Sequence, residues 1–290
     1  MSATAGSTSR PIWRGARQWW IQTTIICSSA LVARPRVWRW PQPLGGRAAE
    51  IAFDPEDGGT IRVVFGTRPA PGDGNDATLF AAIPLRQSAR GDYDGKAVSS
   101  GDLTLLAQAA RRPGVDLVLM TDRPQMGRVR DLVMAGNSAQ LGDPALMTEL
   151  QRWIRFNPRA ALKTGDGLFS AASGNPALPD WLGPAMVGLT LRPKSDNARY
   201  AGQIASSSGL AVFVGAEATP ANWVQVGRAC QRFALQATAL GMKVAFLNQP
   251  VEVPGQRAEP AALAGLPGRR PDLVMPELWP KVGDAAIRRL

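Results

Sequence analysis

Two arginines and a serine stand two residues apart at Arg86, Ser88 and Arg90, inside the stretch IPLRQSARGDYDG at 83–95. Guanidinium groups form bidentate, charge-assisted hydrogen bonds with phosphate oxygens, and a serine hydroxyl adds a further donor. The triplet is therefore a candidate phosphate-binding site. Taken alone, the pattern is more often an exposed polar surface, because most charged side chains lie in solvent.

A second pair of polar residues, Asn248 and Gln249, follows the apolar run that begins at Lys243. The run KVAFLNQP at 243–250 predicts a strand. Ligand contacts often gather in the segments that follow strands, so the two amides are candidate binding residues. Without further support, such residues more often belong to an ordinary connection.

Several kinds of chemistry are excluded by composition. Histidine is absent from the chain, which removes Ser-His-Asp and Cys-His catalysis and histidine-ligated metals. The two cysteines, Cys27 and Cys230, are too far apart in sequence to form a metal or redox motif, so we expect no metal site and a reducing, cytoplasmic location. The glycines near 165–174 match neither a dinucleotide-binding fingerprint nor a P-loop. No apolar run is long enough to span a membrane.

The net charge of +10 is carried mainly by the first 49 residues, which hold seven arginines and no acidic residue. The remainder of the chain has 26 basic and 23 acidic residues, a net charge of +3. A nearly balanced body does not provide a surface that follows phosphates, so we expect no nucleic-acid partner.

Residues 1–47 are unusual in composition as well, with five of the nine tryptophans. One interpretation is a signal peptide, with Arg10, Arg14 and Arg17 as its basic part and Trp19 to Leu31 as its apolar part. Another is translation in the wrong frame, because shifted codons for WIQTTIIC can encode Asp-Pro-Asp-His-His-Leu. A genuine, atypical N-terminus is the third. We favour the second, and expect residues 1–47 to be mistranslated or disordered.

The rest of the chain predicts strands and helices without the regular alternation of βαβ units, which favours an α+β fold. A hairpin is expected at 50–66, around Asp57-Gly58-Gly59. A polar, glycine-rich loop at 164–176 is either a lid over a ligand or a surface connection. Helices are expected at 99–110, 124–140, 144–156, 195–207, 220–240 and 260–266, and further strands at 115–121, 210–216, 243–250 and 271–275.

Several blocks, in order, resemble the nitroreductase-like FMN family. They are residues 83–110, with the Arg-x-Ser-x-Arg motif, residues 227–241 and residues 246–275. Residues 152–184 and 194–215 are more closely similar to a bacterial branch in which two nitroreductase-like halves are fused in one chain. Proteins of that branch are often labelled putative nitroreductases or twin-arginine signal proteins.

This resemblance implies that residues 48–290 form a nitroreductase-like domain, an antiparallel sheet flanked by helices, with FMN at a real or internal two-fold interface. The FMN phosphate would contact Arg86, Ser88 and Arg90. The residues near the flavin ring would be Asn248, Gln249 and Pro250. It also implies two-electron transfer from NAD(P)H through FMN to a nitroaromatic, quinone or similar acceptor, with no catalytic side chain, because the flavin carries the chemistry.

The chain departs from the family at both ends. The Asn-Gln-Pro-Trp-type motif of the first half is missing, Ala97 stands where proline is usual, and the tail after 275 diverges. These departures suggest a truncated copy. Two alternatives to an enzyme therefore stay open: a non-catalytic FMN-binding or storage protein of the same fold, or an inactive gene product. We expect an internal pseudo-dimer or a homodimer, and no membrane partner.

Overall fold

The computed structural model describes residues 47–54, 60–69, 76–88, 91–170, 177–183, 185–186 and 192–278. The N-terminal segment before residue 47, Arg90 and the tail after 278 lie outside the described residues. The proposed boundary between residues 47 and 48 therefore stays a prediction.

The described chain contains strands and helices in mixed order. The strands are β1 (Arg47–Asp54), β2 (Thr60–Pro69), β3 (Val115–Met120), β4 (Ile154–Arg155), β5 (Leu168–Phe169), β6 (Gly209–Gly215), β7 (Lys243–Val244) and β8 (Pro271–Leu278). The helices are α2 (Asp76–Ala82), η3 (Ile83–Leu85), α3 (Ser100–Ala110), α4 (Arg123–Leu141), α5 (Pro144–Trp153), α6 (Pro158–Thr164), α8 (Pro193–Ser206), α9 (Pro220–Ala239), α10 (Gln249–Glu252), η5 (Pro254–Gln256) and α11 (Ala258–Leu263).

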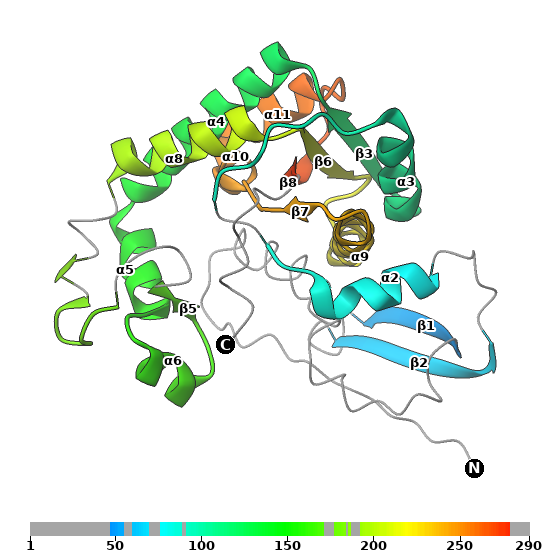
Figure 1. Cartoon of the computed structure of the whole chain (residues 1–290), viewed down its shortest axis with the longest axis horizontal. Helices are drawn as coiled ribbons and strands as arrows, with labels where there is room; N and C mark the ends of the chain where they lie inside the picture. The colour runs from blue at the N-terminus through cyan, green and yellow to red at the C-terminus, as the bar shows by residue number, and fades with distance from the viewer. Residues whose placement is uncertain are drawn as a thin grey trace.

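The central sheet has four strands in the order β3-β6-β8-β7, and every neighbouring pair is antiparallel (Figure 1). Helices cover both of its faces. The α+β class, with an antiparallel sheet flanked by helices, is therefore confirmed. The predicted hairpin is present as the antiparallel pair β1–β2, whose turn lies outside the described residues.

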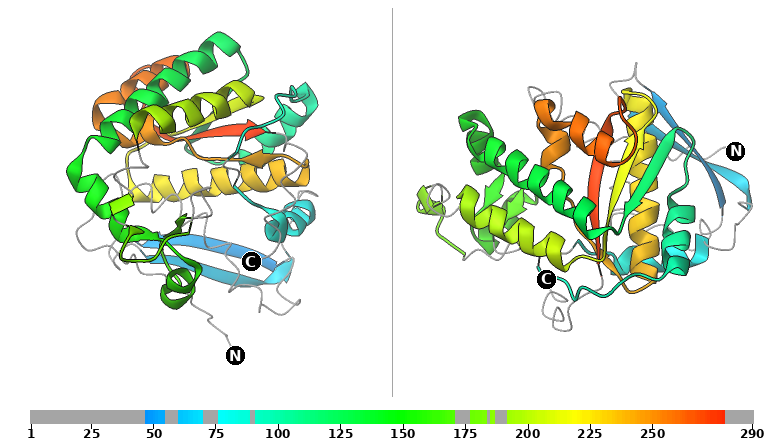
Figure 2. Two further views of the ribbon diagram at one scale, coloured as in Figure 1. Left: turned by 60° about the vertical axis from the view of Figure 1, so that its left-hand side comes forward. Right: turned by 90° about the horizontal axis from the view of Figure 1, so that it is seen from above.

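Two hydrophobic cores lie on opposite faces of this sheet. Successive side chains of β6 point to opposite faces. Ala211 and Phe213 pack with α9 and α3, whereas Val212 and Val214 pack with α4 and α8. The ring of Phe213 meets Phe233 of α9 edge-on, with centroids 5.5 Å apart. Figure 2 shows the resulting layers, with α4 and α8 on one side of the sheet and α9 on the other.

Helix starts follow the capping residues in the sequence. The Ser99 hydroxyl accepts a hydrogen bond from the Asp102 N–H, and Thr219 does the same for Asn222. The expected helix at 144–156 is shorter, because α5 ends at Trp153 and Asn157 caps a further helix, α6. A proline just after a cap has a backbone already suited to the first helical turn, so the Asn157-Pro158 pair begins α6 and does not end α5.

The predicted strand at 243–250 is wrong beyond Val244. Strand β7 covers only Lys243 and Val244, and Gln249 is the first residue of the short helix α10. Pro250 explains the change, because proline has no N–H for a strand ladder and its fixed φ suits the first turn of a helix. Asn248 and Gln249 therefore lie at a helix start rather than at a strand end.

Candidate functional site

The serine of the Arg-x-Ser-x-Arg motif lies at an edge of the central sheet. Ser88 forms an isolated parallel bridge with Val244 of β7, the edge strand. Arg86 follows η3, and its backbone N–H donates to the carbonyl of Ala82 at 3.0 Å. The bridge orders one member of the predicted phosphate triplet beside β7 and places Arg86 two residues before it. Arg90, the third member, lies outside the described residues.

Asn248 lies in the segment that follows β7 and runs beside β8. The Leu247 N–H donates to the Val274 carbonyl at 3.0 Å, and Asn248 Oδ1 accepts from the Val274 N–H at 3.2 Å. Asn248 is 8% exposed. The amide oxygen thus accepts the hydrogen bond from β8 that the backbone carbonyl of a neighbouring strand would otherwise accept. This gives Asn248 a structural role that explains its burial without a ligand.

Gln249 differs from its neighbour. Gln249 is 9% exposed, and its Oε1 is buried with no hydrogen-bond partner among the described residues. A buried acceptor left without a donor costs about 1–3 kcal/mol. Such an oxygen points to an occupant that brings an N–H or O–H group. Pro250, next to it, is buried and shapes the first turn of α10.

The two halves of the predicted site, Ser88 and the Asn248–Pro250 turn, are linked through the segment that follows β7. Val244, which bridges Ser88, and Asn248 are separated by four residues, or at most about 13 Å at strand spacing. A ligand with an anionic end and a ring that carries N–H groups could reach both halves if it were extended. The structure thus brings Ser88 and the Asn248–Pro250 turn into one neighbourhood.

The sequence analysis missed the polar layer beneath this turn. Gln140 of α4 donates from Nε2 to Glu252 Oε2 at 2.8 Å. Burial raises the pKa of the Glu252 carboxyl, and the Gln140 hydrogen bond and the positive charge of Arg257 oppose that rise without cancelling it. The available signal was an acidic residue between apolar neighbours in the run Pro250 to Val253.

Gly136 of α4 allows α10 to approach closely. A Cβ at this position would lie 2.9 Å from the backbone carbon of Gln249 and 2.9 Å from Oε1 of Gln256. Any larger residue would push the two segments apart. The absence of a side chain at Gly136 therefore sets the position of Gln249.

A cavity of about 130 Å³ lies at the other end of the sheet, where β6 ends and β8 begins. Its walls include Gly215, Arg270 and Asp272 and contain none of the predicted site residues. Asp272 Oδ2 there accepts the Gly215 N–H at 2.8 Å. This hollow is distinct from the predicted site.

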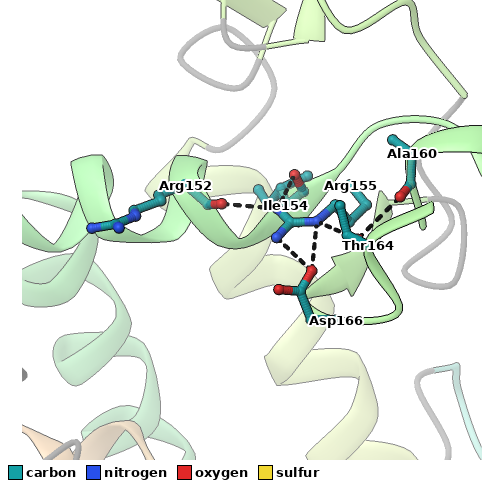
Figure 3. Close-up of polar contacts among 6 residues, drawn as sticks. All are labelled: Arg152, Ile154, Arg155, Ala160, Thr164 and Asp166. Carbon is teal, nitrogen blue, oxygen red and sulfur yellow. Dashed lines mark hydrogen bonds and ion pairs between the residues drawn. The ribbon is translucent and has the colours of Figure 1, made fainter. Parts of the chain in front are cut away.

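A polar cluster also surrounds Arg155 of β4 and joins it to Thr164 and Asp166, at the end of α6 and the start of the predicted loop (Figure 3). Its Nε donates to Thr164 Oγ1 at 3.0 Å, its Nη2 donates to Asp166 Oδ1 at 2.7 Å, and its Nη1 donates to the Arg152 carbonyl at 2.8 Å. All three nitrogens thus have acceptors within the chain. The cluster closes a turn, and the described part of the loop at 164–176 is a structured connection.

Two features bear on metals and membranes. Within the described ranges, no group of three or more histidine, cysteine or acidic side chains could hold a metal ion. None of the helices in those ranges has both the length and the apolar character needed to cross a membrane.

Comparisons with known proteins found likenesses among solved structures only. No family model and no curated protein matches the chain. A nitroreductase with bound FMN from Desulfitobacterium hafniense is 17% identical, with a TM-score of 0.44, over 73% of this chain and 97% of that one. A nitroreductase with bound FMN from Bacteroides fragilis is 14% identical, with a TM-score of 0.43, over 71% of this chain and 89% of that one. An NADPH:FMN oxidoreductase from Vibrio harveyi, complexed with NAD⁺, is 12% identical, with a TM-score of 0.42, over 70% of this chain and 68% of that one.

Proposed function

We propose that this chain is an FMN-dependent oxidoreductase of the nitroreductase-like type, which transfers two electrons from NAD(P)H to a nitroaromatic, quinone or similar acceptor. The observation that carries the proposal is the unpartnered, buried Oε1 of Gln249 on the segment that Ser88 joins. The isoalloxazine ring of FMN has an N–H group on its uracil-like edge. That group is the kind of donor that the Gln249 oxygen lacks.

The anionic end of FMN suits the other half of the site. Arg86, Ser88 and Arg90 offer two guanidiniums and a hydroxyl to a phosphate dianion. The resemblance of residues 83–110 to the family's opening block supports the same assignment. Asn248 would hold this turn beside the ligand, because its Oδ1 already accepts a hydrogen bond from β8. Pro250 would contribute a rigid apolar wall.

The side chains of this chain would bind and orient rather than react. When FMN is bound, it supplies the redox chemistry of hydride acceptance and donation. Arg86 and Arg90 would neutralise the phosphate, and Ser88 would fix its depth at the β7 edge. Gln249 would set the ring's rotation through one hydrogen bond. The apolar face formed by Pro250 and Val251 would keep water from that edge.

The purified protein tests the proposal directly. We expect it to be yellow, with a flavin absorbance spectrum that NAD(P)H bleaches and that a quinone or nitroaromatic restores. Bound FMN that NAD(P)H does not reduce would favour the storage alternative. A colourless chain that takes up no added FMN would contradict the proposal. Sedimentation of the loaded protein would show whether it works as a homodimer.

A further inference from the structure

The part of the chain between α4 and α8 takes no share in the cores of the sheet. Its described residues, 143–170 and 177–183, carry α5, β4, α6 and β5, and we call them the arm. Figure 1 shows α5, α6 and β5 to one side of the central sheet. Among the described side chains, those that build the two cores and the smaller cluster around Leu79 include none from the arm. The packing that holds the sheet therefore does not hold the arm.

Helix α5 shows how little apolar surface anchors the arm to the rest of the molecule. Leu146, Met147 and Leu150 share one face of this helix, yet all three are only half-buried. Among the described elements, α4, which directly precedes α5 in the chain, is the only one that packs extensively against it. Leu162 of α6 and Trp181 are 85% and 81% exposed. A half-covered apolar face gives only part of the free energy that full burial would give.

The polar contacts inside the arm are well formed by comparison. Arg155 of β4 donates to the Arg152 carbonyl at the end of α5, to Thr164 at the end of α6, and to Asp166 just before β5. One guanidinium thus joins all four elements of the arm. The ion pair with Asp166 has a distance of 2.7 Å.

A second set of contacts folds the segment 177–183 back onto the start of α6. The Leu178 N–H donates to the Phe156 carbonyl at 2.9 Å, and Asn157 Nδ2 donates to Asp180 Oδ1 at 2.7 Å. Phe156 is buried, and Gly183 lies so close to its ring that a Cβ would not fit between them. The arm therefore has a small core of its own, centred on one phenylalanine.

The junction between α4 and α5 consists of Gly142 and Asp143. The Gly142 N–H donates to the Ser138 carbonyl at 3.0 Å and completes α4. The Asp143 carboxylate accepts from the Ala145 N–H at 2.9 Å and begins α5. Because each helix has its own cap, a change of backbone angles at the junction leaves both helices intact. Hinges of moving units commonly lie at such short connections.

We propose that the arm is a conformational device that opens as one unit about the Gly142–Asp143 junction, while both cores of the sheet stay closed. The Arg155 cluster holds its four elements together during this motion. Parts of a protein with few buried apolar contacts open at a lower free energy than its cores, and they do so as contiguous cooperative units. The arm contains none of the residues predicted to bind FMN, so this inference does not rest on the proposed function.

Hydrogen exchange of the full-length protein, followed by mass spectrometry at several urea concentrations below the unfolding midpoint, tests the proposal. We expect α5 and α6 to exchange at one common rate, at least about 100-fold faster than α9. Their rate should depend little on urea, because opening the arm exposes little new surface. Exchange of α5 and α6 at the rate of α9 would overturn the proposal, and so would unrelated rates for α5 and α6.

A variant tests the role of Arg155 within the arm. Arg155→Gln should speed the exchange of both α5 and α6 about tenfold, a low value for the loss of one charged hydrogen bond, and should leave α9 unchanged. The matched control Arg128→Gln, an exposed site on α4, should keep the wild-type rates. Faster exchange of α6 with α5 unchanged would refute the joining role of Arg155. Equal acceleration of α5 and α9 would refute the independence of the arm, and the wild-type measurement decides that point even if the variant does not fold.

Discussion

Two polar clusters of this molecule differ in whether their hydrogen bonds are complete. Around Arg155, three guanidinium nitrogens meet acceptors from Arg152, Thr164 and Asp166. Around α10, the buried oxygens of Gln249 and Gln256 lack donors. A completed network holds a fold together, whereas buried acceptors without donors cost stability, and a bound ligand is one way to supply the donor. The difference indicates a structural role for the first cluster, and it is the reason we propose a ligand at the second.

The largest effect should come from removing both guanidiniums of the predicted phosphate site. Arg86→Ala with Arg90→Ala should weaken FMN binding by about 3–6 kcal/mol, from two charged contacts of about 1.5–3 kcal/mol each. Fluorescence titration with FMN measures the change. Arg128→Ala with Arg130→Ala on α4 removes the same charge and serves as the control. Equal affinities for the two double variants would remove the site assignment.

Next in size, Gly167→Ala should break the Arg155 cluster without touching the flavin. Gly167 has φ +74°, and a Cβ there would lie 2.3 Å from the Trp153 carbonyl oxygen. Strain and overpacking together should lower the free energy of unfolding by about 3 kcal/mol. Gly165→Ala shares the positive φ but meets open space, so it should cost only about 1–2 kcal/mol. Urea unfolding compares them, and equal losses would mean that the clash is absent.

Gly136→Ala, in the cluster around α10, should have an intermediate effect on stability. Overpacking against Gln249 and Gln256 should cost about 1–3 kcal/mol of stability and should also weaken FMN binding. Gly127→Ala lies on the same helix in open space and should be neutral or stabilising by up to about 1 kcal/mol. Thermal unfolding and FMN titration measure both. A stable Gly136→Ala protein with normal affinity would contradict the close contact of α4 with α10.

The smallest effect should be that of Asp166→Asn. The hydrogen bonds from Arg155 and Thr164 hold the pKa of Asp166 below its ordinary value of 3.8. Its contribution is present above pH 3.8 and lost as the pH falls through the folded pKa. Because the carboxylate is exposed, we expect a slight drop in the urea midpoint at neutral pH that disappears in acid. Asp131→Asn, an exposed partner of Arg130, is the control. A drop that persists in acid would contradict the charge effect.

The fold could be predicted where local patterns determine it. The apolar run of β6, the Ser99 cap of α3 and the Pro220 start of α9 are each visible in the sequence, and each appears in the structure. The end of β7 was missed because an apolar run predicts burial as readily as a strand. Only the proline at 250 distinguishes the helix that begins there.

The candidate site was predictable in part, for a different reason. Arg86 and Ser88 carry their chemistry in their residue types, so the sequence alone suggests a phosphate site, which stays a prediction. Glu252, Gln140 and Gly136 act through contacts between segments more than 100 residues apart. No local pattern encodes such contacts. The contrast between Asn248, bonded to β8, and Gln249, left without a donor, likewise exists only in the folded chain.

The most direct test of the account is Gln249→Met, which replaces the unpartnered oxygen with an apolar side chain of similar length. Urea unfolding of the flavin-free protein and FMN titration of the same sample give the two quantities needed. We predict that stability stays the same or rises by up to about 1 kcal/mol, while FMN affinity falls about tenfold, the loss of one buried hydrogen bond. A variant that loses stability and binds FMN as tightly as the wild type would show that Gln249 serves the fold, and would contradict the account.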